Sequence, residues 1–337
     1  MSDKSAVDEA LASPNIARSA IMFILTLCSV YLVYGFQWTI GNPLTDSDIA
    51  WESFQFSVAL MTILLCHEMG HYLVAKRHGF ALSVPYFIPF PFAFGTLGAV
   101  IHLKSLPKSR TALLEMGAAG PIAGFIVTTL CIFGDAPNTV NHQAVEVQGS
   151  LSQYVEEVQS IPPAEGIWST LNDLLGVQSP SIEQFDVLIM ADPLLMKLGH
   201  SFVLDVPLSP FANLGPIAFA GWVGCLITSI NLLPIGQLDG GHIINAIFPD
   251  RAKEISKGLL GAVFVYGLFT WKGWMVWSTL LWFMGASVPV WVPHNSELSV
   301  RARMIAIIAI GIFALCAMSE PIYSTTVQVN DIIWIED

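Results

Sequence analysis

Long apolar stretches separated by short polar segments form the main pattern of this chain. Seven stretches are apolar enough to be candidate membrane-spanning helices. They cover residues 17–36, 54–76, 111–134, 212–234, 257–271, 274–292 and 303–318. A helix needs about 20 residues to cross a hydrocarbon core of about 30 Å. Because the stretch at 257–271 is short, the pattern predicts about six to seven transmembrane helices.

Two further apolar segments do not fit a spanning helix. Residues 81–102 contain three prolines and two glycines, which disfavour a regular helix. The β-compatible end of this segment predicts an extended segment or β-hairpin that dips into the membrane, where protein or water must satisfy its backbone. Residues 186–204 are amphipathic and interrupted by a proline, which predicts an interfacial helix.

The composition favours a polytopic α-helical membrane protein. Hydrophobic residues make up 54% of the chain and charged residues only 12%, and the mean hydropathy is +0.62. Soluble domains carry about 25% charged residues. The five cysteines are scattered and form neither a CxxC pair nor a secreted disulfide framework. The net charge of −12 gives no sign of nucleic-acid binding.

The distribution of charge predicts the orientation in the membrane. Nine acidic residues and no Lys or Arg lie between Asp135 and Met196, and residues 319–337 are also acidic. Basic residues flank the opposite ends of the candidate spans: Lys76, Arg77, Lys104, Lys108, Arg110, Arg251, Lys253, Lys257, Arg301 and Arg303. Because Lys and Arg favour the cytoplasmic side, we expect a cytoplasmic N-terminus and an extracytoplasmic C-terminus, in the cell membrane if the chain is prokaryotic.

This topology divides the chain into five parts. A cytoplasmic N-terminal tail (1–16) precedes a first membrane part (17–134). An acidic extracytoplasmic loop with the interfacial helix (135–211) leads to a second membrane part (212–318), and an acidic extracytoplasmic tail (319–337) follows. The first stretch lacks a small-residue cleavage site, so we interpret it as an anchor rather than a signal peptide.

Residues 67–71 read His-Glu-Met-Gly-His within an otherwise apolar stretch. On a helix this H-E-x-x-H spacing puts both imidazoles on one face, one turn apart, as a zinc site requires. The adjacent Glu68 can act as a general base toward water. Ionisable residues within a span are costly and point to function. His67 lies nine residues before Lys76, about 14 Å from that end of the helix at 1.5 Å per residue.

A catalytic zinc site also needs a third protein ligand, and Asp239 is the best candidate. It ends the sequence Asn231-Leu-Leu-Pro-Ile-Gly-Gln-Leu-Asp239, which follows the apolar stretch at 212–234. We expect Pro234 to break the helix there, and Gly240 and Gly241 permit unusual backbone dihedral angles. An acid on such broken backbone can approach the two histidines.

Other interpretations of these polar residues remain open. Glu52 and Glu115 are alternative ligands, but both lie near the ends of spans. His242 can orient Asp239 as a neighbouring partner, and it can equally be a plain polar loop residue. Asn231 can bridge backbone groups that the following proline frees.

The H-E-x-x-H and N-x-x-P-x-x-x-x-D-G motifs, in this order, resemble those of the site-2 protease family of intramembrane zinc metalloproteases, in its prokaryotic and chloroplast-like branch. The resemblance covers roughly residues 50–300. The supporting segments are 85–99, similar to the family's membrane-dipping hairpin, 115–124, similar to its Gly-Pro motif, 220–224, and Pro293-His294. Two departures are His102, where an Arg is commoner, and Asn295, where relatives often have a Pro.

The resemblance implies that His67, His71 and Asp239 bind one zinc ion per chain, that Glu68 is the general base and that Asn231 stabilises the transition state. It implies an intramembrane zinc endopeptidase that cleaves in or near the transmembrane segments of single-span membrane-protein substrates, in regulated intramembrane proteolysis. The alternative is a catalytically silent zinc-binding scaffold or transporter. A transporter tends to show paired repeats, which are not found here, and it has no need of Glu68.

Overall fold

The computed structural model describes residues 16–39, 41–80, 82–101, 105, 107–140, 184–205, 207–208, 212–283 and 297–328. The two departures from the family pattern, His102 and Asn295, lie outside these residues. Most of the acidic loop, the acidic end of the chain and the N-terminal tail also lie outside them.

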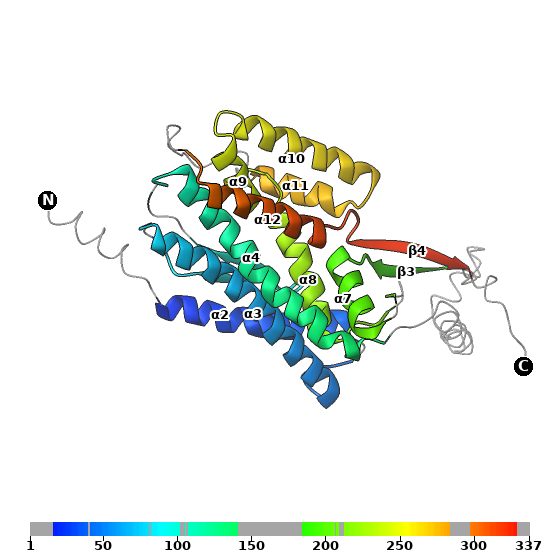
Figure 1. The fold of residues 1–337 in the computed structure, drawn as a ribbon. Helices are drawn as coiled ribbons and strands as arrows, with labels where there is room; N and C mark the ends of the chain where they lie inside the picture. Colours follow the sequence, from blue (N-terminus) through cyan, green and yellow to red (C-terminus); the bar gives the residue numbers. More distant parts are fainter. Residues whose placement is uncertain are drawn as a thin grey trace, which may run out of the picture.

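A helix occupies each of the seven apolar stretches (Figure 1). These are α2 (Ile16–Val33), continued by the π-helical turn η1 (Tyr34–Trp38), α3 (Ser47–Arg77), α4 (Arg110–Asp135), α8 (Pro216–Asn231), α10 (Ala252–Phe269), α11 (Gly273–Phe283) and α12 (Val300–Cys316). Within the described ranges, three helices are long and apolar enough to cross a membrane: α2 with η1, α3, and α4 with its short 3-10 continuation. A helix therefore lies at each expected position, while the number of helices that cross the membrane stays a prediction.

Polar side chains at the helix ends explain where several helices begin. Asp46 accepts hydrogen bonds from the backbone N–H groups of Asp48 and Ile49 at the start of α3. The hydroxyls of Ser109 and Ser299 each accept one from the third residue beyond, at the starts of α4 and α12. Such caps satisfy N–H groups that the helix itself leaves unpaired.

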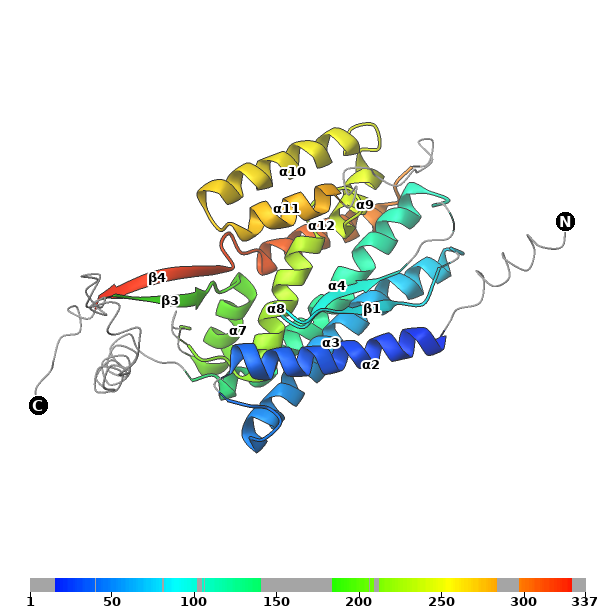
Figure 2. The ribbon, with the colours of Figure 1, turned by 180° about the vertical axis from the view of Figure 1, so that it is seen from behind.

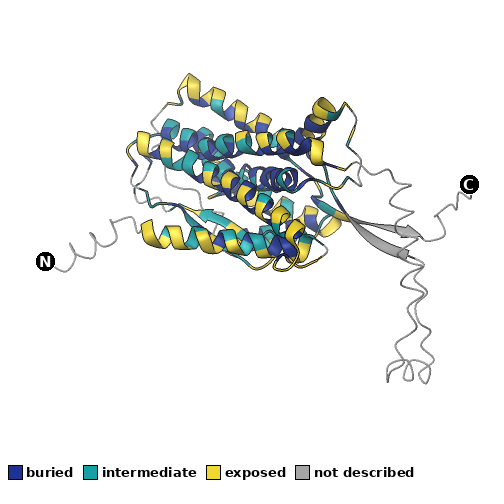
Figure 3. Cartoon of the chain, turned by 90° about the horizontal axis from the view of Figure 1, so that it is seen from below, coloured by how far each residue is buried: buried dark blue, intermediate teal, exposed yellow. Residues whose placement is uncertain are grey.

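Helix α4 is the centre of the bundle, with α3 and α8 packed against it (Figures 1 and 2). Glycines allow this close approach. A Cβ at Gly70 of α3 would lie 2.4 Å from the carbonyl oxygen of Ala119, and one at Gly224 of α8 would lie 2.4 Å from Thr128 Oγ1. Small residues at helix interfaces are typical of membrane bundles, where backbone approach supplies much of the packing energy. Figure 3 shows buried residues in this centre and exposed residues along the outer helices.

The segment expected to be extended forms a β-hairpin, as predicted. Strand β1 (Tyr86–Pro89) pairs antiparallel with β2 (Thr96–Val100). Its turn rests on the end of the first helix, where Trp38 Nε1 donates a hydrogen bond to the Ala93 carbonyl at 2.8 Å. Gly95 has φ +84°, and a Cβ there would lie 2.4 Å from a Cα atom of α2. Only glycine allows the turn to approach the helix this closely.

The expected interfacial helix at 186–204 is wrong in its first part. Residues 194–204 form helix α7 (Leu194–Leu204), but strand β3 (Gln184–Met190) precedes it. This strand pairs antiparallel with β4 (Ile322–Gln328) along its whole length, and the two strands extend away from the helices (Figures 1 and 2). Since the pairing partner lies far along the chain, no local pattern could indicate it.

Charged side chains at the two ends of α4 contact neighbouring elements. At one end, His78 after α3 lies 2.9 Å from Glu115 of α4, and Arg301 of α12 lies 3.7 Å from the same carboxylate. At the other end, buried Asp135 accepts hydrogen bonds from the backbone N–H groups of Ile217 and Ala218 at the start of α8. Which end faces the cytoplasm stays a prediction.

Candidate metal centre

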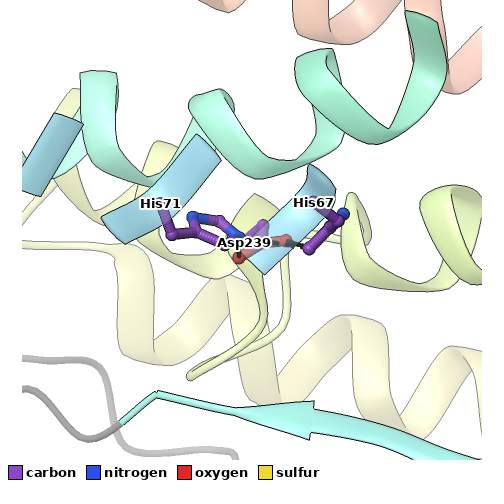
Figure 4. A group of neighbouring side chains, drawn as sticks. All are labelled: His67, His71 and Asp239. Atoms are coloured by element: carbon purple, nitrogen blue, oxygen red, sulfur yellow. Dashed lines mark hydrogen bonds and ion pairs between the residues drawn. The ribbon is translucent and has the colours of Figure 1, made fainter. Parts of the chain in front are cut away.

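Helix α3 places the two histidines of the H-E-x-x-H motif on one face, four residues apart. Their ring centroids are 4.8 Å apart, and the two Nε2 atoms are 3.1 Å apart. His67 is only 4% exposed. Figure 4 shows both rings directed toward the carboxylate of Asp239.

Helix α4 fixes the orientation of these rings. The Nδ1 atom of His71 lies 2.8 Å from the carbonyl oxygen of Met116, so this nitrogen carries the donated proton. Two glycines of α4 leave room for the rings. A Cβ at Gly120 would lie 2.0 Å from His71 Nε2, and one at Gly124 would lie 3.3 Å from His67 Nδ1. Any side chain at Gly120 would therefore occupy the space of the His71 ring.

Asp239 opens the short helix α9 (Asp239–Ile247), after a tight turn that follows α8. The two glycines after it allow this turn to fold back on itself. A Cβ at Gly240 would lie 2.1 Å from the carbonyl oxygen of Leu232, and one at Gly241 would lie 2.2 Å from that of Gly236. These contacts give a packing reason for the Asp-Gly-Gly sequence.

Arg110, the first residue of α4, holds the other end of α9. Its Nε and Nη2 atoms donate hydrogen bonds to the carbonyl oxygens of Ala246 and Ile247, each at 2.7 Å. A cation at the carboxyl end of a helix also interacts favourably with the helix dipole. Helix α9, and with it Asp239, is thereby attached to the start of α4.

The three side chains meet at distances that suit a metal ion. Asp239 Oδ2 lies 3.1 Å from His67 Nε2, and Oδ1 lies 3.2 Å from His71 Nε2. Ligands of a tetrahedral zinc ion with bonds of about 2.0–2.1 Å are roughly 3.3 Å apart. Among the described residues, these three form the group of His, Cys, Asp and Glu side chains able to hold a metal ion.

The hydrogen bonding of this group also fits a cation. Because His71 donates through Nδ1, its Nε2 carries a lone pair when the ring is neutral, and this nitrogen faces the other two side chains. Asp239 Oδ2 is buried and makes no well-oriented hydrogen bond within the described part of the chain. A buried polar atom without a partner costs about 1–3 kcal/mol. A zinc ion takes nitrogen and carboxylate ligands, so it would bind both His71 Nε2 and Asp239 Oδ2.

The two alternative ligands, Glu115 and Glu52, lie away from the two histidines. Glu115 pairs with His78 at the basic end of the bundle, and Glu52 is exposed near the start of α3. Cys66 is half-buried and is not one of the grouped side chains. The structure therefore brings Asp239, and neither glutamate, to the two histidines.

The remaining candidate residues are Glu68, Asn231 and His242. Glu68 is buried in α3 and interacts electrostatically with His67, His71 and Asp239. Asn231 is the half-buried last residue of α8, and its side chain has no hydrogen-bond partner in the described ranges. His242 Nδ1 is buried and likewise unpartnered there, and its role as a partner that orients Asp239 stays a prediction.

Two contributions to the site were missed at the level of the sequence. The glycines at 117, 120 and 124 of α4 share one helix face by their spacing alone, so a face of small residues could have been predicted. A Cβ at Gly117 would lie 3.2 Å from the carbonyl oxygen of Asp239, so this face contacts α9 as well as α3. The role of Arg110 had no such signal, because the carbonyls that it binds lie more than 130 residues away.

Comparison with curated proteins finds chloroplast zinc metalloproteases among the relatives. The chain is 27% identical over 259 residues to the probable zinc metalloprotease EGY2, chloroplastic, of Oryza sativa subsp. indica, covering 73% of this chain and 40% of the relative. It is 31% identical over 221 residues to EGY2 of Arabidopsis thaliana, covering 63% and 33%. It is 32% identical over 193 residues to EGY1 of the same plant, covering 57% and 29%. The chain thus spans less than half the length of these relatives.

Comparison with protein families gives a match that contains the whole candidate site. The profile of Peptidase family M50 matches residues 55–271, well over half of the 337-residue chain. No solved structure matches significantly. The matched range includes most of α3 and all of α4, α8 and α9, which are the elements that bring His67, His71 and Asp239 together. The chain belongs to Peptidase family M50.

Proposed function

We propose that this protein is an intramembrane zinc endopeptidase that hydrolyses peptide bonds in or near the transmembrane segments of membrane proteins. One observation carries the proposal: two histidines of a membrane-spanning helix meet a carboxylate from a distant loop at metal-ligand distances, with a buried glutamate beside them. The names of the plant relatives, which are zinc metalloproteases, support zinc as the metal.

In this proposal His67, His71 and Asp239 would hold one zinc ion, since three protein ligands are typical of catalytic zinc sites. A zinc ion held there supplies a Lewis acid, which polarises the scissile carbonyl and makes water acidic enough to attack at neutral pH. The Met116 carbonyl keeps the proton of His71 on Nδ1, so that Nε2 is ready to act as a ligand.

Glu68 moves the proton in the proposed reaction. Its carboxylate accepts a proton from the attacking water and then gives it to the leaving amine. The side-chain amide of Asn231, which has no partner among the described residues, donates a hydrogen bond to the developing oxyanion. His242 as the partner that orients Asp239 stays a prediction.

A transmembrane substrate must first expose its backbone. A helical segment hides its carbonyl groups in hydrogen bonds to the fourth residue beyond, so it has to unwind locally before cleavage. The hairpin has two strands among the described residues, which leaves β2 with an edge able to pair with an extended substrate. We propose single-span proteins as substrates, in regulated intramembrane proteolysis.

The proposed membrane topology follows from the charge pattern. The basic ends of α3, α4 and α12 would face the cytoplasm, with a cytoplasmic N-terminus. The β3–β4 sheet and the acidic segments would then lie on the other side of a multi-pass membrane protein.

The test compares two glutamates of α3 in a reconstituted assay with a single-span reporter. Glu68→Gln should keep one zinc ion per chain and lower the cleavage rate at least about 100-fold, which is the scale of general-base catalysis. Glu52→Gln changes an exposed glutamate of the same helix and should keep both zinc and cleavage. Cleavage at the wild-type rate by Glu68→Gln would overturn the assignment. Zinc binding without any cleavage by the wild type would favour a silent zinc-binding scaffold.

A further inference from the structure

Ser256 of α10 contacts the turn that carries Asp239, although α10 supplies none of the candidate ligands. Its hydroxyl accepts a hydrogen bond from the backbone N–H of Gly236 at 2.9 Å, and it donates one to the carbonyl oxygen of Pro234 at 3.4 Å. Ser256 is 1% exposed. One side chain therefore bridges the backbone on both sides of Ile235.

The turn is inserted against the α10–α11 pair. Ile235 is fully buried in a small apolar cluster with Leu260 of α10 and Leu281 of α11. Gly236 has φ +43°, a left-handed conformation that favours glycine. The Ser256 bond and the contact between Ile235 and Leu260 thus fix this left-handed part of the turn from one neighbouring helix, α10.

A short path of contacts leads from Ser256 to the ligand. The backbone N–H of Gly236 donates a hydrogen bond to Ser256. The carbonyl oxygen of Gly236 packs against Gly241, where a Cβ would lie only 2.2 Å from it. Gly241 belongs to the first turn of α9, two residues after Asp239. A shift of Gly236 would therefore move the start of α9, whose carboxylate lies 3.1 and 3.2 Å from the two histidine nitrogens.

Packing near this turn is not continuous, which increases the importance of a specific bond. An apolar cavity of about 320 Å³ lies between α8, α10, α11 and α12. Its lining includes Leu233 of the same turn, Val263, Trp274 and Phe313. The packing of α10 against the end of α8 is therefore interrupted beside the turn.

We propose that Ser256 is a positioning residue for the metal centre: its hydroxyl holds the Pro234–Gly236 turn so that Asp239 is aligned with His67 and His71. This inference rests on the proposed zinc site. It assigns α10 a role in metal retention that its own sequence does not suggest. Groups that orient metal ligands typically contribute about 10- to 100-fold to metal affinity.

The experiment measures two quantities that do not depend on proteolysis. The first is the rate at which the purified full-length protein loses zinc to an excess of chelator. The second is backbone hydrogen exchange of a peptide that covers residues 232–238 in the metal-free protein. Ser256→Ala removes the hydroxyl, and Ser256→Cys keeps the volume but offers a much weaker hydrogen-bond partner. Ser278→Ala is the matched control, because Ser278 is a buried serine of α11 whose hydroxyl bonds to the Met275 carbonyl of its own helix.

We expect both Ser256 variants to lose zinc about 10-fold faster or more and to exchange faster at residues 232–238, while Ser278→Ala follows the wild type. Zinc loss at the wild-type rate in both Ser256 variants would overturn the proposal. Fast loss by Ser256→Ala with normal loss by Ser256→Cys would also overturn it, because packing would then explain the effect. A wild type that binds no zinc would instead contradict the proposed function, and the exchange measurement would still test the contact between Ser256 and the turn.

Discussion

Gly120 of α4 faces His71 of α3 so closely that a Cβ at Gly120 would lie 2.0 Å from His71 Nε2. The same ring is oriented by its bond to the Met116 carbonyl, one turn earlier on α4. The position of His71 thus depends on the absence of a side chain at Gly120 of α4 as well as on α3, the helix that carries it. The backbone of α4 serves as one wall of the centre.

The first prediction concerns this contact. Gly120→Ala should displace the His71 ring and lower zinc affinity about 10- to 100-fold. Gly134→Ala is the control, because Gly134 lies in the same helix and its Cβ would meet nothing within 4 Å. The control should keep zinc and gain up to about 1 kcal/mol from better helix propensity. Equal zinc affinity in the two variants, measured by competition with a chelator, would contradict the role of Gly120.

Arg110 provides a second test, through the end of α9. Arg110→Gln removes charge-assisted bonds to the Ala246 and Ile247 carbonyls, so the free energy of unfolding should fall by about 2–3 kcal/mol. Arg301→Gln removes only an exposed ion pair of 3.7 Å with Glu115 and should cost under about 1 kcal/mol. Denaturant titration in detergent micelles measures both. A smaller loss for Arg110→Gln than for Arg301→Gln would show that α9 is held by other contacts.

The third prediction concerns the hairpin turn. Trp38→Phe removes the indole N–H that binds the Ala93 carbonyl, but it keeps a ring to stack on Phe94, now 5.3 Å away. Loss of a hydrogen bond worth about 1 kcal/mol should speed backbone hydrogen exchange in residues 86–100 by about 5-fold.

Trp222→Phe is the control for the hairpin, since it removes an equivalent indole bond to the Ala191 carbonyl beside α7. It should speed exchange near residues 184–194, and because Phe keeps a ring beside Phe94 of the hairpin, it should change the hairpin less than Trp38→Phe does. If both variants change the hairpin alike, the cause is a general loosening of the aromatic side chains around Phe94, and Trp38 has no special role.

The fourth prediction is a pH dependence outside the spanning helices. Burial raises the pKa of Asp192 from 3.8 to about 6, and Lys197 opposes only part of this shift. Between these pH values the folded protein binds a proton that the unfolded chain does not bind, so stability should rise as the pH falls through this window. Asp192→Asn should melt above the wild type at pH 8 and lose this advantage near pH 4. An advantage that stays constant with pH would contradict burial as the cause.

Local patterns explain why much of this molecule could be predicted from the sequence. Apolar runs gave the positions of the seven helices, and the prolines and glycines of 81–102 gave the hairpin. The H-E-x-x-H spacing placed His67 and His71 together because four residues make about one helical turn. The choice of Asp239 over Glu115 depended on broken backbone after Pro234, which the turn before α9 confirms.

What could not be predicted depends on contacts between distant parts of the chain. Strand β3 was interpreted as helix because its partner, β4, begins more than 130 residues later. The bonds that join Arg110 to α9, Asp135 to α8 and Ser256 to the Gly236 turn span 136, 83 and 20 residues, which is beyond the reach of a helical or strand period. In each case a short polar contact decides how two helices meet, and such contacts leave no periodic signal in the sequence.

The β3–β4 pairing imposes a counting rule on the membrane topology. Met190 and Ile322 are direct partners in that sheet, so they lie on the same side of any bilayer. The chain between them must therefore cross the bilayer an even number of times. Among the described residues, the longer helices of this interval are α8, α10, α11 and α12. The number of full crossings in the interval can therefore change only by two.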